Sequence, residues 1–227
     1  CIGGNLGAIP ECLKKRSYFL KPEDFMPEKM LANDDLDLQL VWLQVLLDKG
    51  LSFTSDDLME EFIKCYPANP NEYGYGKRNY RRGIKPPVSG TFANEFFMNS
   101  MGCPIRAEIW AMICPGRPEK GIELAYRDGC LDHGEESIYA EQYITALESL
   151  SFLSQDRLEL IKKASEYIPE TSRIYHVISD VSGAFEKGAE LEKVMDYLET
   201  EYGDVDCSIS FYNIGVIALA LLYGNGE

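Results

Sequence analysis

In the stretch DHGEESIYAEQYITALESLSFL, residues 132–153, apolar side chains return every three or four positions after residue 136. This spacing is typical of one face of an α-helix, and the side chains that share the face are Tyr139, Tyr143, Ala146, Leu147 and Leu150. The segment is the strongest of a series of helical patterns, and that series determines the predicted fold class.

Helical periodicity, or the signals that begin and end helices, recurs along the second half of the chain. Helices are expected at residues 118–130, 136–153, 156–167, 171–187, 189–201 and 213–223. The segment CSISFYNI, residues 207–214, is compatible with a short strand, but Asn213 as the cap of a following helix fits at least as well. No segment alternates convincingly as a strand does, so we predict an all-α fold, a single compact multi-helical domain over residues 1–227.

Two helices are also expected before residue 66. After Asn33, four leucines recur at helical spacing and are predicted to form one buried face that ends near Gly50; they are Leu36, Leu40, Leu43 and Leu47. Thr54 followed by Asp57 has the spacing of a capping pair and indicates the start of a second, shorter helix.

Residues 66–92 have no clear period and are rich in Pro and Gly, so we predict a long ordered loop. The loop carries a basic cluster in an otherwise acidic chain, made of Lys77, Arg78, Arg81, Arg82 and Lys85. Two interpretations stay open. The cluster either balances the charge of neighbouring acidic helices or contacts an anionic substrate or partner.

Composition narrows the possible partners and compartments. The chain has 227 residues, 45% of them hydrophobic, and a formal net charge of −15. This charge argues against nucleic acid or an anionic membrane surface as the main partner, and no apolar run approaches the roughly 18–20 residues of a membrane span. The seven cysteines form no CxxC pair, which argues against a disulfide framework or a cysteine zinc site. We therefore expect a cytoplasmic protein, with a targeting signal ahead of Cys1 left open.

The first candidate site is the acidic stretch that follows Asn33. Asn33 is a good N-cap, and Asp34 and Asp35 would lie in the first turn, where the helix dipole favours ionised carboxylates. Adjacent helix residues point about 100° apart, so the two carboxylates could serve two metal ions. Hard cations such as Mg²⁺ prefer oxygen ligands of this type. An ordinary acidic helix start is the alternative.

Three further stretches could contribute to chemistry. GGNLGAIPE, residues 3–11, places glycines before Glu11, either for close helix packing or for approach to a ligand. MGCPIR, residues 101–106, breaks the chain before a helix, and Arg106 could bind an anionic group or form a structural ion pair. His133, in DHGEES, is either part of a capped helix start or a group that positions substrate.

In this order, the motifs resemble those of the ADP-ribosylglycohydrolase family. The resemblance covers nearly the whole chain and is carried by GGNLGAIPE, ANDDLDLQL, MGCPIR, AYRDGCLDHGEESIYAEQYITALESLSF and NIGVIALALLYGNGE. It implies an all-α domain with two Mg²⁺ ions in a central cleft. The implied reaction is hydrolysis of the bond between ADP-ribose and a protein side chain or small acceptor. The implied partners are ADP-ribosylated proteins or small molecules that contain ADP-ribose.

The resemblance also assigns roles to individual residues. It implies Glu11 and Asp35 as catalytic residues; Asn33, Asp34 and Asp35 as metal ligands; and Gly102, Arg106 and His133 as substrate-binding residues. Asn33 stands where the family usually has a threonine, and an amide oxygen can also coordinate Mg²⁺.

One departure from the family pattern bears on the expected activity. The family closes its metal site with an Asp-x-Asp-Thr type motif, which would follow Glu227. We therefore expect a fragment that lacks its C-terminal helices and part of its metal site. Two alternatives remain: a protein of the same fold that binds ADP-ribose or a nucleotide without cleaving it, and a glycohydrolase that acts on another N- or O-glycoside.

Overall fold

A computed structural model describes residues 33–224, together with the single residues Gly7 and Lys21. Within this part, every named element is a helix, and β-type pairing is limited to an isolated bridge between Ser100 and Ile209. The prediction of an all-α fold is confirmed. No helix of the described part is both long and apolar enough to cross a membrane.

The helices of the second half begin and end close to the predicted positions, whereas the first half holds more helix than the sequence suggested. In chain order the α-helices are α2 (Asp34–Lys49), α3 (Ser55–Cys65), α4 (Asn71–Arg81), α5 (Val88–Thr91), α6 (Glu108–Met112), α7 (Pro118–Gly129), α8 (Glu135–Ser151), α9 (Arg157–Ser165), α10 (Arg173–Glu186), α11 (Leu191–Glu201) and α12 (Ser210–Tyr223). Two 3₁₀ turns, η2 (Gly50–Ser52) and η3 (Pro104–Arg106), lie between them.

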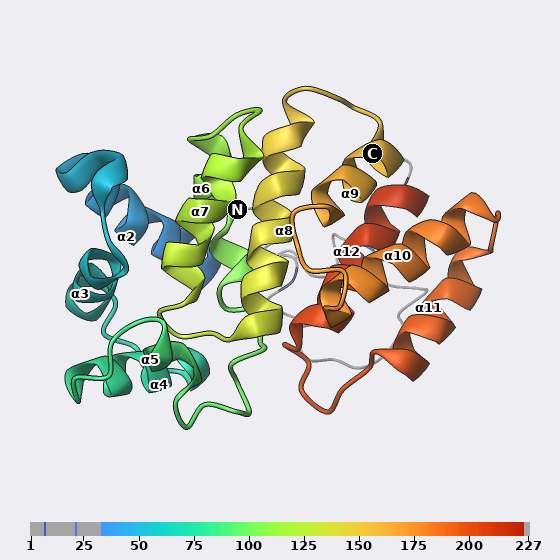
Figure 1. Cartoon of the computed structure of the whole chain (residues 1–227). Coiled ribbons are helices and arrows are strands. Elements are labelled where there is room, and N and C mark those ends of the chain that lie inside the picture. Colours follow the sequence, from blue (N-terminus) through green and yellow to red (C-terminus); the bar gives the residue numbers. More distant parts are fainter. Residues whose placement is uncertain (1–6, 8–20, 22–32, 225–227) are drawn as a thin grey trace.

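Helix α8 runs through the middle of the molecule, with α2 to α7 on one side and α9 to α12 on the other (Figure 1). It packs against α7 and α9. Two clusters of buried apolar side chains flank it. One joins α8 to α9–α12 around Tyr143, Val177 and Ile214, and the other joins α2, α3, α6 and α7 around Trp42 and Trp110. The strong helical pattern of residues 136–153 therefore marks the central element of the fold.

The start of α3 has the capping geometry that its sequence predicted. The Thr54 side chain accepts a hydrogen bond from the backbone N–H of Asp57, and the Asp57 carboxylate accepts one from the backbone N–H of Thr54 at 2.8 Å. Two N–H groups that the helix itself leaves without partners are thereby satisfied.

The predicted buried face of α2 is wrong. Leu36, Leu40, Leu43 and Leu47 are 37%, 63%, 42% and 73% exposed, and the buried side chains are instead Leu38, Val41, Trp42 and Val45. Apolar residues on α2 form two overlapping stripes, and periodicity alone does not choose between them. Trp42 decides the choice, because its large ring packs edge-on against Phe62 of α3, with the ring centroids 5.5 Å apart.

The predicted loop at residues 66–92 is also wrong, because it contains α4 and α5. Its glycines look like helix breakers in the sequence, but Gly76 faces another segment at very short range. A Cβ atom there would lie 2.8 Å from the Leu131 carbonyl oxygen and 2.7 Å from Asp132 Cβ. Glycine thus lets α4 pack directly on the loop between α7 and α8, and this packing outweighs its low helix propensity.

Within the basic cluster, Lys77 and Lys85 favour a structural interpretation. Lys77 is buried, and its Nζ donates hydrogen bonds to the carbonyl oxygens of Tyr66 and Ala68 at 2.5 and 2.9 Å. Burial lowers the pKa of Lys77 to about 8. Lys85 forms an ion pair of 3.3 Å with Asp56. Arg81 and Arg82 are exposed.

The segment CSISFYNI combines features of both expectations. Ile209 forms the isolated bridge and is the N-cap of α12, so the helix begins ahead of Asn213. Asn213 lies inside α12, and its Nδ2 donates to the carbonyl oxygens of Cys207 and Ile209 at 3.0 and 2.8 Å. Cys207 is disulfide-bonded, which the sequence did not suggest; the free cysteines in the described part are Cys65, Cys103, Cys114 and Cys130.

Candidate functional site

A pocket of about 530 Å³ lies where four segments distant in sequence meet. They are the start of α2, the start of α4, residues 101–105 and the segment that leads into α12. The lining residues are Asp34, Asp35, Pro70, Asn71, Glu72, Tyr73, Met101, Gly102, Ile105, Cys207, Ser208 and Asn213. Within the part of the chain that the structure describes, the lining therefore contains three carboxylates and no Lys, Arg or His side chain.

The structure places the predicted metal residues at the edge of this pocket. Asp34 and Asp35 lie in the first turn of α2 and both line the pocket. Asn33 is the N-cap residue, as predicted, but its side chain makes no capping hydrogen bond. Its Oδ1 atom is buried and has no hydrogen-bond partner in the part of the chain that the structure describes. An amide oxygen without a partner thus directly precedes two pocket carboxylates.

Gly102 lines the same pocket and connects it to α4. The Tyr73 hydroxyl donates to the Gly102 carbonyl oxygen at 3.2 Å and lies 3.4 Å from Asp34 Oδ2. A Cβ atom at position 102 would overlap Glu72 Oε1 and lie 2.8 Å from His133 Nε2. Only glycine leaves room for these groups to converge behind the pocket wall.

His133 lies behind the pocket wall rather than in it. The side chain is fully buried, and Nδ1 pairs with Asp132 Oδ1 at 2.6 Å. On the other edge of the ring, Nε2 is 3.3 Å from Ser100 Oγ and 3.7 Å from Glu72 Oε1. Burial by itself lowers the pKa of His133, but Asp132 and then Glu72 outweigh burial, so the pKa is raised. The protonated imidazole can therefore sit between two carboxylates.

Arg106 is fully buried and forms a structural ion pair, the alternative that the sequence left open. It contacts Asp128 at 2.7 Å and Asp132 at 2.9 Å through its guanidinium group, and Trp110 donates to Asp128 at 3.0 Å. Burial opposes ionisation of Asp132, but Arg106 and His133 lower its pKa to about 2. Arg106 is not among the lining residues, and it connects to the pocket through Asp132, His133 and Glu72.

Glu72 is a pocket residue that the sequence interpretation missed. The sequence predicts a loop at residues 66–92, whereas Glu72 lies in the first turn of α4. The signal was present in the sequence, since Pro70 just before the helix and a glutamate in its first turn are typical of a helix start. Glu11, the other predicted catalytic carboxylate, lies outside the described residues.

Comparison with known protein families identifies a match over nearly the whole chain. The sequence model of the ADP-ribosylglycohydrolase family matches residues 1–225. This chain belongs to that family. ADP-ribosylglycohydrolases are hydrolases of glycosidic bonds, and the family is typically metal-dependent. No curated protein and no solved structure gives a significant match to the chain.

The oxygen donors at the start of α2 fit the metal that an ADP-ribosylglycohydrolase is expected to use. Asp34 and Asp35 present carboxylates to the pocket, and Asn33 Oδ1 is a buried acceptor without a partner. Divalent hard cations select carboxylate and amide oxygens of this kind. Within residues 33–224, no three His, Cys, Asp or Glu side chains form a metal-binding group, so the fit rests on these oxygens.

Proposed function

We propose that this chain hydrolyses the glycosidic bond that joins ADP-ribose to a protein side chain or small acceptor, and that Mg²⁺ binds at the start of α2. One observation carries the proposal. In a member of the ADP-ribosylglycohydrolase family, Asp34 and Asp35 line a pocket large enough for part of a nucleotide-sugar, and Asn33, directly before them in the chain, has a buried side-chain oxygen without a partner among the described residues.

We assign the following roles to individual residues of the chain. Asp34, Asp35 and Asn33 would hold the cation, and the Tyr73 hydroxyl lies beside them, 3.4 Å from Asp34 Oδ2. When bound, Mg²⁺ would supply positive charge next to the ribose hydroxyls and lower the pKa of a bound water. Glu11 is proposed as the general base that accepts a proton from the attacking water, whose oxygen bonds to the sugar carbon as the acceptor leaves.

The metal assignment is tested by replacing one carboxylate at a time. Asp34→Asn and Asp35→Asn each remove a charged ligand, so we expect hydrolysis of an ADP-ribosylated substrate to fall by about 100-fold or more. The same variants should lose the rise in unfolding temperature that Mg²⁺ produces in the wild type, because stabilisation follows binding. Calorimetry with Mg²⁺ alone gives a third readout that does not depend on turnover.

Asp37→Asn is the matched control, because Asp37 lies in the same first turn, is exposed and does not line the pocket. It should keep both the turnover rate and the response to Mg²⁺. If Asp34→Asn and Asp35→Asn behave like Asp37→Asn, the metal assignment is wrong. If the wild type binds ADP-ribose but does not cleave any ADP-ribosylated substrate, the protein is a binder of the same fold.

A further inference from the structure

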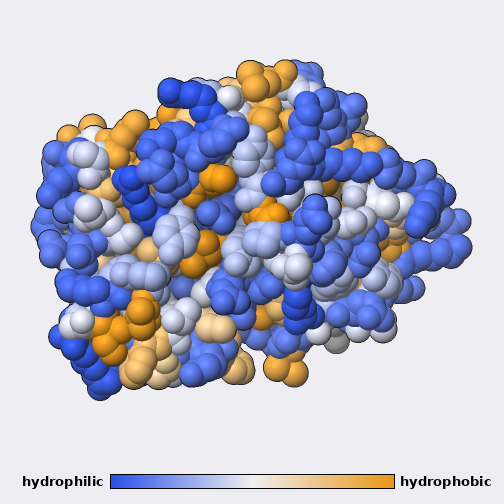
Figure 2. Space-filling view, in the orientation of Figure 1, coloured by the Kyte–Doolittle hydropathy of each residue, from blue (hydrophilic) through white to orange (hydrophobic). Residues whose placement is uncertain are grey.

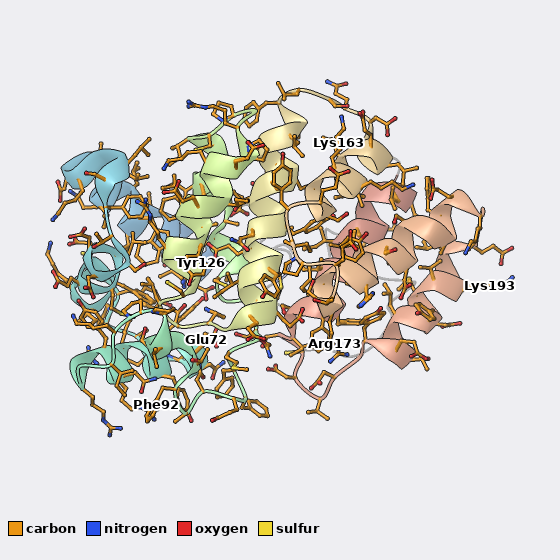
Figure 3. All side chains as sticks on the ribbon, viewed as in Figure 1. Glu72, Phe92, Tyr126, Lys163, Arg173 and Lys193 are labelled. Atoms are coloured by element: carbon orange, nitrogen blue, oxygen red, sulfur yellow. The ribbon has the colours of Figure 1, made fainter. Side chains whose placement is uncertain are left out.

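Glu72 occupies an unusual position for a carboxylate. Its side chain is only 9% exposed, yet the residue lines the pocket. Oε1 faces His133 Nε2 at 3.7 Å, whereas Oε2 is buried and has no hydrogen-bond partner among the residues that the structure describes. Figure 3 shows Glu72 close to the loop that joins α7 to α8, the loop that carries His133.

A buried acceptor without a partner destabilises the folded state, because water is lost and nothing replaces it. Apolar side chains such as Met101 and Ile105 also line the pocket, so its wall is not uniformly polar. A carboxylate kept there at a cost in stability is typical of a site that meets its partner only when a ligand binds.

A series of buried charged groups leads to the Glu72 carboxylate from the core. Arg106 anchors Asp132 at 2.9 Å, Asp132 orients the His133 ring at 2.6 Å, and the ring faces Glu72 Oε1. Gly102 contributes by having no side chain, because a Cβ atom there would overlap Oε1. Buried charged groups thus fix the position of Oε1, and Oε2 is left to accept a hydrogen bond from a ligand.

The chemistry of the ligand group follows from the surroundings. An ionised carboxylate only accepts hydrogen bonds, so its partner must be an O–H or N–H donor. Among the described residues, the pocket lining holds no Lys, Arg or His to act as that donor. We propose that Glu72 determines specificity at this site by accepting a hydrogen bond from a donor on the terminal sugar or its linkage, a ribose hydroxyl or a protonated nitrogen. This proposal rests on the proposed function.

The test compares Glu72→Gln with the full-length wild-type chain in calorimetric titrations with ADP-ribose and with ADP, both in the presence of Mg²⁺. The amide keeps the size of the side chain but removes the negative charge. If the donor is a ribose hydroxyl, the affinity for ADP-ribose should fall by about tenfold, the effect of losing one charged hydrogen bond. The affinity for ADP, which lacks the terminal sugar, should change by less than about twofold.

An ADP-ribosylated arginine peptide, used as a third ligand, separates the two kinds of donor. A loss with both ADP-ribose and the peptide supports a ribose hydroxyl, and a loss with the peptide alone supports the nitrogen of the linkage. Glu192→Gln, a glutamate exposed on α11, is the control and should bind all three ligands as the wild type does.

Equal affinity of wild type and Glu72→Gln for both sugar-containing ligands would overturn the inference, and so would an equal loss for ADP and ADP-ribose. If Glu72→Gln does not fold, Glu72→Asp replaces it: this variant keeps the charge opposite His133 but withdraws it from the pocket, and it should show the same selective loss. Failure of the wild type itself to bind any of these ligands would instead refute the proposed function.

Discussion

At the scale of single residues, burial shifts the pKa of Glu148. Glu148, on α8, is partly buried and lines a second, mostly apolar cavity of about 250 Å³ beside Ile144, Leu147 and Leu160. Burial, with a smaller contribution from Glu108, raises the pKa of Glu148 to about 8. No pattern in the sequence distinguishes this glutamate from the exposed ones, because its environment consists of residues brought together by folding.

The raised pKa of Glu148 predicts a dependence of stability on pH. Its folded-state pKa of about 8 lies above the ordinary value of 4.5, so its contribution is complete below about pH 4.5 and is lost as the pH rises through about 8. Glu148→Gln removes this loss. We expect the variant to equal the wild type at pH 4 and to exceed its unfolding free energy by at least about 1 kcal/mol at pH 8.5.

Urea denaturation at the two pH values measures this difference, and Glu192→Gln is the control that should follow the wild type at both. A variant that is less stable than the wild type at pH 8.5 would show that Glu148 makes a favourable charged contact.

At the scale of elements, α2 shows why hydrophobic periodicity does not by itself identify the buried face. Leu38 is fully buried and Leu40 is 63% exposed, although both are leucines two positions apart on one helix. Trp42 and Phe62 settle the orientation through contacts that join α2 to α3. The exposed stripe is part of the surface of the molecule.

The face of the molecule in Figure 2 is largely hydrophilic. It also carries an apolar patch near α4 and α5, where Phe92 lies (Figures 2 and 3).

Two matched substitutions test the orientation of α2. Leu38→Ala should cost about 2–5 kcal/mol of unfolding free energy, because it removes buried methyl groups and leaves a cavity. Leu40→Ala should change stability by less than about 0.5 kcal/mol. Chemical denaturation of both variants provides the measurement, and equal costs would mean that α2 buries the other stripe in solution.

At the scale of the whole molecule, a buried ionic network links the core to the pocket. Arg106 in η3, Asp128 in α7 and Asp132 in the following loop are all fully buried. The network continues through His133 to Glu72 on the pocket wall. Arg106 thus connects through Asp132 and His133 to Glu72 on the pocket wall, although its own side chain does not line the pocket.

Removing Arg106 should therefore affect stability strongly. Arg106→Met leaves Asp128 and Asp132 buried without their cation, and we expect a loss of about 3–5 kcal/mol in urea denaturation. Arg82→Met, at an exposed position after α4, is the matched control and should stay within about 0.5 kcal/mol of the wild type. A loss no larger for Arg106→Met than for Arg82→Met would mean that the network contributes nothing to stability.

The sequence by itself determined the helical class, the positions of the later helices, the capped start of α3 and the family motifs, because these depend on local periodicity and on residues near in sequence. Only the tertiary structure decided which stripe of α2 is buried and that α4 is a helix. It also decided that His133 lies behind the wall of the pocket that Glu72 and Gly102 line. These outcomes depend on contacts between segments 20 or more residues apart along the printed chain, such as Trp42 with Phe62, Glu72 with Gly102 and Gly76 with Asp132. Such contacts carry the burial and electrostatic energies that local propensity does not contain.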